Sequence, residues 1–206
     1  MRAVAAVLLF PLIPFSAFAQ GGASYSIDPR QSKMEIHVGK EGAFKAFGHD
    51  HLIAARQVSG EVRLDPRRIE QSSVRLQVPT KSITVIDPGE SEKDRKEVQA
   101  TMEGEKVLDV AKFPEVTFTS TRISAAKKTS DGWEFTLSGK LNLRGVENPV
   151  TFPLHVRADN NELRAEGEVS ILQTDYGITP VKVGGGTVKV KDKLKITFTI
   201  VASESH

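Results

Sequence analysis

The amino-acid sequence predicts an all-β fold, an antiparallel β-barrel of about eight strands with one short helical excursion. Three observations support this prediction. Apolar and polar residues alternate with the period of a strand along most of the chain, turn-forming residues separate the alternating segments, and a single stretch has the composition of a helix.

The first 19 residues have the features of a secretory signal peptide. Arg2 supplies a positive charge, residues 3–18 are almost wholly apolar or small, and residues 17–19 read Ala-Phe-Ala, the small-x-small pattern of a signal peptidase site. Cleavage is therefore expected after Ala19, which leaves one domain over residues 20–206, exported to the periplasm. A transmembrane anchor is the alternative, but the apolar run is short for a bilayer and contains two prolines.

The exported domain contains eight segments in which apolar residues occupy every second position, as in strands that bury one face. In the clearest segment, Trp133, Phe135 and Leu137 share one face, and Glu134 and Thr136 lie on the other. The segments are 33–38, 58–64, 73–78, 116–123, 133–144, 150–157, 162–171 and 194–200.

Turn-forming residues lie between these segments and predict tight reversals. They are Asp28-Pro29, Asp65-Pro66, Asp131-Gly132 and Asp159-Asn160-Asn161, with a hairpin loop over 144–149. The segment from Gly39 to Gln57 is interpreted as a long loop between early strands.

The stretch from Ser91 to Val110 is charged and rich in helix formers. Ser91 and Asp94 have the spacing of a capping box, and Val98 and Met102 form an i, i+4 contact face. We expect a short helix here, packed against the sheet, with a division into two pieces at Gly104 as the alternative.

Long amphipathic strands leave edges that have to be protected, and closing the sheet into a barrel removes those edges. Alternation alone does not exclude a two-layer β-sandwich, which remains the alternative architecture.

The composition restricts the partners. Lys and Arg total 28 against 26 Asp and Glu, and they are interspersed, so no nucleic-acid partner is expected. No segment after the leader is apolar enough for a stable membrane anchor. The chain has no Cys, so packing and backbone pairing have to stabilise it without disulfides. A homodimer through an exposed strand edge is an alternative that the sequence does not support.

Several strings resemble, in order and spacing, the YceI-like family of bacterial proteins. They are Tyr25-Ser-Ile-Asp-Pro29 with Ser32, residues 107–114, residues 116–121, residues 139–146, residues 149–152 and Asp175-Tyr-Gly-Ile178. The resemblance covers nearly all of the exported domain.

The resemblance implies an extended, lipocalin-like barrel that binds a polyisoprenoid or another long apolar chain, is exported in many members and has no catalytic residues. Two segments depart from the usual pattern. Gly48-His-Asp-His-Leu52 replaces a shorter His-Leu-Gly type segment, and Val98-Gln-Ala-Thr-Met102 stands where Arg-Asp-x-His-Leu is usual. These departures point to a different ligand or a different barrel mouth.

The predicted function is that of a carrier or sensor holding an isoprenoid-like or fatty ligand inside the barrel, without enzymatic activity and without a cofactor. Each buried methylene of such a ligand contributes about 0.8 kcal/mol. The expected ligand-binding residues are Phe118, Trp133, Phe135, Leu137, Leu141, Phe152, Leu154, Tyr176, Ile196 and Phe198. Tyr176 and Arg144 are candidates for contacting a polar head group, and the loops 44–55 and 181–187 are candidate gates. A solid core, and hence an interaction module without ligand, is the alternative.

His49-Asp50-His51 is the one motif that suggests other chemistry. Two imidazoles at i and i+2 of an extended segment lie on one face and suit Zn or Cu, with His37 as the nearest further ligand. We predict no metal site, because there is no Cys and no second spaced pair. One imidazole is instead expected to satisfy loop backbone groups and the other to pack at the barrel rim. A metal-binding protein or metalloenzyme remains the alternative function.

A hydrolase is not favoured, because the chain has neither Gly-x-Ser-x-Gly nor Cys. Its isolated aspartates, Asp65, Asp87 and Asp109, are interpreted as turn or cap residues.

Overall fold

The fold is taken from a computed structural model that describes residues 22–41, 50–159, 161–183 and 188–205. The predicted signal peptide lies outside the described residues, as do His49 and parts of both predicted gate loops.

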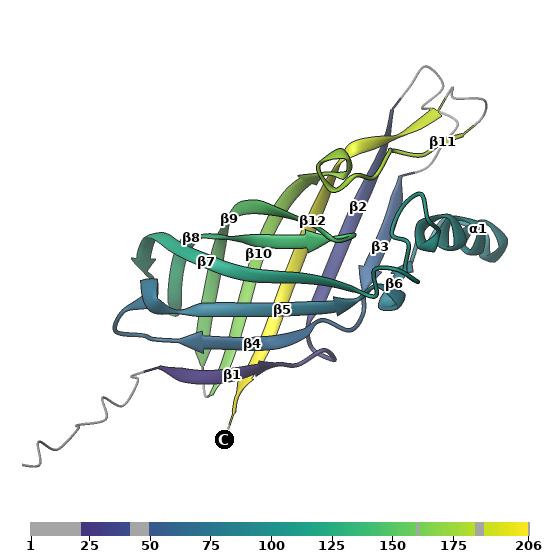
Figure 1. Cartoon of the computed structure of the whole chain (residues 1–206). Coiled ribbons are helices and arrows are strands. Elements are labelled where there is room, and N and C mark those ends of the chain that lie inside the picture. Colours follow the sequence, from purple (N-terminus) through teal and green to yellow (C-terminus); the bar gives the residue numbers. More distant parts are fainter. Residues whose placement is uncertain (1–21, 42–49, 160, 184–187, 206) are drawn as a thin grey trace, which may run out of the picture.

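Most of the described chain is antiparallel β-sheet (Figure 1). The strands are β1 (Ala23–Ile27), β2 (Lys33–Glu41), β3 (His51–Ala55), β4 (Ser59–Leu64), β5 (Ser73–Pro79), β6 (Ile83–Val85), β7 (Glu115–Lys128), β8 (Gly132–Leu143), β9 (Val146–Asp159), β10 (Glu162–Leu172), β11 (Lys182–Val183) and β12 (Val188–Glu204).

Eight strands form a closed ring in the order β1-β4-β5-β7-β8-β9-β10-β12, and β1 closes it by pairing with both β4 and β12. The predicted eight-stranded antiparallel barrel is therefore confirmed, and the sandwich alternative is wrong. The membership of the ring differs from expectation in one respect. The segment 33–38 forms β2 outside the ring, and the ring closes through β1, which is too short to show alternation.

Strand β12 is long enough to serve two partners along one of its edges. Its last residues pair with β1, and its first part pairs with β2, which continues the sheet into β3 and β6. The three strands form a flange beside the ring, and Figure 1 shows the tip of β2 rising with β11 beyond the ring.

Two segments interpreted as loops contain ordered strand. Strand β3 lies inside the predicted loop 39–57. Its alternation covers only five residues, and backbone pairing with β2 and β6 stabilises it as a strand. The predicted hairpin loop 144–149 shrinks to Arg144-Gly145, both at positive φ (54° and 75°), while Asn148 and Pro149 lie within β9. Two consecutive residues at positive φ suit the twist of a tight hairpin.

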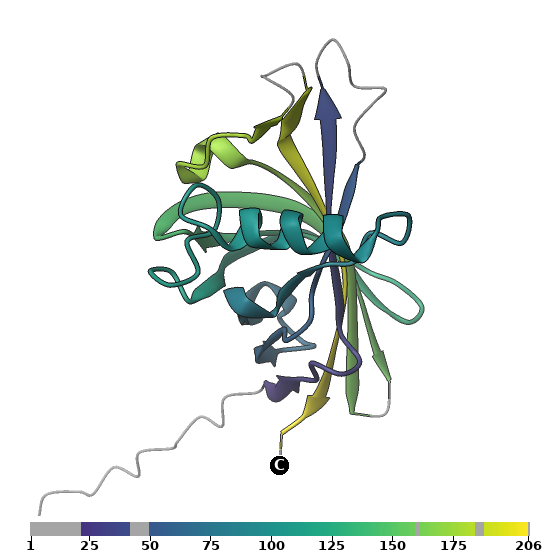
Figure 2. The same cartoon turned by 90° about the vertical axis from the view of Figure 1, so that its right-hand side faces the viewer.

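The helix α1 (Glu92–Glu103) begins at the N-cap Ser91, whose side chain accepts a hydrogen bond from the Asp94 amide at 3.1 Å, as predicted. It ends at Gly104, and the second helical piece is wrong. After Gly104 the chain turns, because the amide of Asp109 returns to the carbonyl of Gly104 and Asp109 has a positive φ of 48°. Figure 2 shows α1 lying across one side of the barrel. Within the described ranges, no helix has the length and apolar character to span a membrane.

Candidate ligand cavity

The interior of the barrel is hollow. A cavity of about 540 Å³ lies inside the ring and continues along the flange. It is lined by inward-facing side chains of the ring strands and of β2, β3 and β6, together with Val98 and Met102 of α1. It extends from Leu163 and Ala202, next to the closing strand β1, to Lys40 and Val190 near the tips of β2 and β12. Ligand pockets in proteins span about 300–1,000 Å³, so the volume suits a small ligand with a long chain.

Three phenylalanine rings form a continuous band on the cavity wall. The ring centroids of Phe118 and Phe152 are 5.8 Å apart, and those of Phe152 and Phe198 are 5.7 Å apart in an edge-to-face arrangement. These separations are in the range in which aromatic pairs attract each other. The band is therefore a stable apolar surface.

Two glycines provide the space that the band occupies. A Cβ at Gly139 would lie 2.3 Å from the ring of Phe118, and a Cβ at Gly167 would lie 2.7 Å from the ring of Phe198. Each ring therefore covers a glycine on a neighbouring strand, where any side chain would displace it.

Polar side chains are few in the cavity, and most lie toward the flange end and α1. They are Lys40, His51, Ser72, Ser73, Glu97, Thr101, Gln173 and Lys189. An apolar cavity with a small number of placed polar groups is the usual form of a ligand site, in which the polar groups fix orientation.

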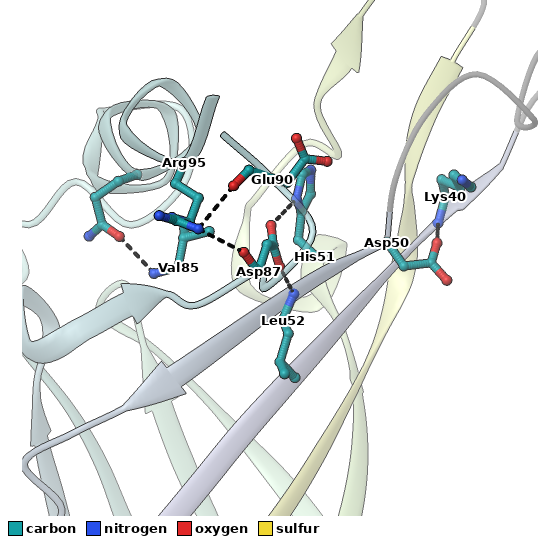
Figure 3. Close-up of polar contacts among 9 residues, drawn as sticks. Lys40, Asp50, His51, Leu52, Val85, Asp87, Glu90 and Arg95 are labelled. Atoms are coloured by element: carbon teal, nitrogen blue, oxygen red, sulfur yellow. Dashed lines mark hydrogen bonds and ion pairs between the residues drawn. The ribbon is translucent and has the colours of Figure 1, made fainter. Parts of the chain in front are cut away.

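Among these polar groups, His51 is held in place by a network of hydrogen bonds (Figure 3). Its Nδ1 lies 2.6 Å from Oδ2 of Asp87, whose residue is 3% exposed, and the other oxygen of Asp87 accepts from the Leu52 amide. The guanidinium of Arg95 on α1 donates to the backbone carbonyls of Asp87 and Glu90. The segment that carries Asp87 is thus bonded to both β3 and α1.

Comparison with known proteins now assigns the chain to a family. Residues 25–202 match the model of the YceI-like domain. The chain belongs to the YceI-like family. Curated relatives include a UPF0312 protein from Yersinia pestis (strain Pestoides F), 30% identical over 174 residues, which span 80% of this chain and 81% of that protein.

Solved structures share the YceI-like fold. BcnA of Burkholderia cenocepacia aligns with a TM-score of 0.66 at 22% identity, over 86% of this chain and 99% of that one. A polyisoprenoid binding domain from Saccharophagus degradans aligns with a TM-score of 0.62 at 14% identity, over 89% and 99%. The YceI protein of Campylobacter jejuni aligns with a TM-score of 0.56 at 13% identity, over 75% and 85%.

In this YceI-like barrel, eight of the ten side chains expected to contact ligand line the cavity: Phe118, Phe135, Leu137, Leu141, Phe152, Leu154, Ile196 and Phe198. Two do not. Trp133, at the start of β8, packs against the core without reaching the cavity, and Tyr176 lies in the 3₁₀ helix η4 (Gln173–Tyr176), outside the cavity lining. Ligand contact by the eight lining residues remains a prediction.

The candidate head-group residues Arg144 and Tyr176 lie away from the cavity. The guanidinium of Arg144 donates to the carbonyls of Gly177 at 2.8 Å and Glu105 at 2.6 Å, so it holds two loops to the β8–β9 turn. Tyr176 is 1% exposed, and burial raises the pKa of its hydroxyl, with a further contribution from the charge of Asp175. Both residues therefore stabilise the fold at these positions and do not contact the cavity.

Sequence reasoning missed the part of the cavity formed by β3. Ile53 and Ala55 line the cavity together with His51, one side chain at every second position. The signal was present as His-x-Ile-x-Ala, but five residues next to a glycine-containing segment gave no reason to prefer a strand to a loop.

The alternative of a metal site involves His37, His49 and His51, of which the structure describes His37 and His51. His49 lies outside the described residues, and His51 has its Nδ1 bonded to Asp87. Within the described ranges, no three His, Cys, Asp or Glu side chains gather as a metal site would require. His37, the suggested third ligand, lies on the outward face and contacts Thr197 Oγ1 at 3.3 Å.

Proposed function

We propose that this YceI-like protein is an exported, non-enzymatic carrier that holds an isoprenoid-like or fatty molecule inside its barrel. The observation that carries the proposal is the apolar cavity of about 540 Å³, which remains open although four phenylalanines, Phe118, Phe135, Phe152 and Phe198, lie in its lining. A long apolar chain gains free energy with each methylene that leaves water, so such a cavity favours a long chain over a small polar molecule.

One structural relative supports the same class of ligand. It has the same fold at 14% identity and is named as a polyisoprenoid binding domain. Export to the periplasm is proposed from the predicted signal peptide at residues 1–19. An apolar molecule that crosses an aqueous compartment needs a protein that shields it from water.

Native mass spectrometry of the protein purified without detergent tests the proposal. We expect a bound mass that organic extraction removes and that is identified as a chain lipid. The variant Ala165→Phe adds a ring on the cavity wall and should bind less, whereas Thr151→Phe adds the same ring to an exposed outward position and should bind normally. An unliganded mass that persists with added lipid would contradict the proposal.

A further inference from the structure

The side chain of His51 points into the cavity at the end of β3. Side chains alternate along a strand, so His51 lies on the same face as Ile53 and Ala55, which are buried and line the cavity. Its cross-strand partner Val38 is also buried and lines the cavity. The side chain of His51 is 23% exposed, which places it where the apolar wall meets solvent.

The imidazole is held in one orientation by a buried carboxylate. Asp87 accepts from Nδ1 of His51 and from the Leu52 amide, so both of its oxygens have donors. The backbone on either side of the carboxylate is bonded too, through Ile86 N to Leu52 O and Arg95 to Asp87 O. A carboxylate that orients an imidazole through Nδ1 leaves Nε2 as the group that meets a ligand.

Among the described residues, the hydrogen bond of the His51 ring is the one from Nδ1 to Asp87, and none is found at Nε2. The Leu52 amide already donates to the carboxylate of Asp87. Pairing with Asp87 alone therefore does not explain why the imidazole of His51 lies on the cavity wall. The distal nitrogen accepts a hydrogen bond from a hydroxyl when the ring is neutral, and donates one to a carboxylate when the ring is charged.

We propose that His51, oriented by Asp87, is the head-group site of the cavity, and that the bound molecule is an amphiphile whose apolar chain ends in a hydroxyl or carboxyl oxygen. This inference rests on the proposed function and adds the orientation of the bound molecule in the cavity. The chain lies along the Phe118–Phe152–Phe198 band, and the oxygen lies at the flange end beside β3 and α1.

The test compares three probes of equal chain length, hexadecanol, hexadecanoate and hexadecane, by equilibrium partitioning onto the delipidated protein. His51→Asn keeps an amide donor close to the position of Nδ1 and removes the distal nitrogen. His51→Gln places its amide closer to the position of Nε2. His37→Asn is the matched control on the outward face.

The measured quantity is the ratio of each oxygen-bearing probe's affinity to that of hexadecane, compared between variants, because the hydration of the probes cancels in that comparison. We expect His51→Asn to lower the ratio about fivefold for at least one oxygen probe, with hexadecane binding unchanged. His51→Gln should lose less, and His37→Asn nothing.

The oxygen-bearing probe whose ratio falls in His51→Asn identifies the head group as a hydroxyl or a carboxylate. An unchanged ratio in His51→Asn, with thermal unfolding showing an intact fold, would overturn the inference and leave the carrier function standing. Failure of all three probes to bind the wild type would overturn both.

Discussion

At Gly139 the absence of a side chain provides the space in which the ring of Phe118 lies. We expect Gly139→Ala to push that ring toward the lumen, to destabilise the protein by about 1–3 kcal/mol and to weaken hexadecanol binding. Gly89→Ala is the control, because a Cβ there meets nothing within 4 Å. Urea unfolding and probe partitioning measure the two effects, and equal behaviour of the variants would show that Phe118 has room to move.

Arg144 is a residue whose role is set by its contacts across the chain. Asn tolerates the left-handed backbone at this position, so Arg144→Asn removes the guanidinium without adding backbone strain. The carbonyls of Glu105 and Gly177 then lose their donor, and we expect a loss of about 1–2 kcal/mol in the free energy of unfolding. Limited proteolysis should show faster cleavage near both carbonyls. Cleavage at the wild-type rate would contradict this role.

At the scale of elements, α1 protects the edge of the sheet at β6. The amide of Gln99 accepts from the Val85 backbone at 2.8 Å and donates to the Ile83 carbonyl at 2.9 Å, which reproduces the pairing of a neighbouring strand. An unpaired strand edge is a site of local opening and association. The helix therefore both lines the cavity and completes its wall.

We expect Gln99→Met, which keeps the length of the side chain, to speed hydrogen exchange of the Val85 amide by about tenfold or more and to lower stability by about 1–3 kcal/mol. The control is Lys93→Met on the exposed face of the same helix, where the side chain forms a 4.0 Å ion pair with Glu97. Unchanged exchange at Val85 in Gln99→Met would mean that other groups hold the helix against β6.

At the scale of the whole molecule, stability should fall in acid. Hydrogen bonds from Gln31, Thr129, Arg164 and Thr174 lower the pKa of Asp28, Asp131, Glu166 and Asp192, respectively. A carboxyl whose pKa is lower folded than unfolded stabilises the fold above its unfolded pKa, and that contribution is lost as the pH falls through the folded value.

The Tm should therefore change little between about pH 7 and 5 and should fall below about pH 4. Scanning calorimetry over this range measures it. Asp131→Asn should lower the Tm at neutral pH and show a shallower acid decline. A Tm that stays constant to about pH 3 would show that these carboxyls titrate alike in the folded and unfolded chain.

The amino-acid sequence is sufficient to predict which face of each long strand is buried, since alternation requires only that one side of the sheet be apolar. It also determined α1 with its Ser91 cap, and eight of the ten expected cavity residues. These features are local, because the residues that specify them are a few positions apart.

Three features became known from the folded chain: which strands close the ring, that the short segment 51–55 is a strand, and that His51 contacts Asp87. Each depends on a partner far away in the chain: β1 pairs with the last residues of β12, and His51 lies 36 residues from its carboxylate. The cavity likewise depends on distant segments, because the strands of the closed ring, the flange strands and α1 all contribute to its lining. Its volume depends on where Phe118 and Phe198 cover glycines of neighbouring strands. Those contacts are set by the register between strands, and alternation within one strand does not specify that register.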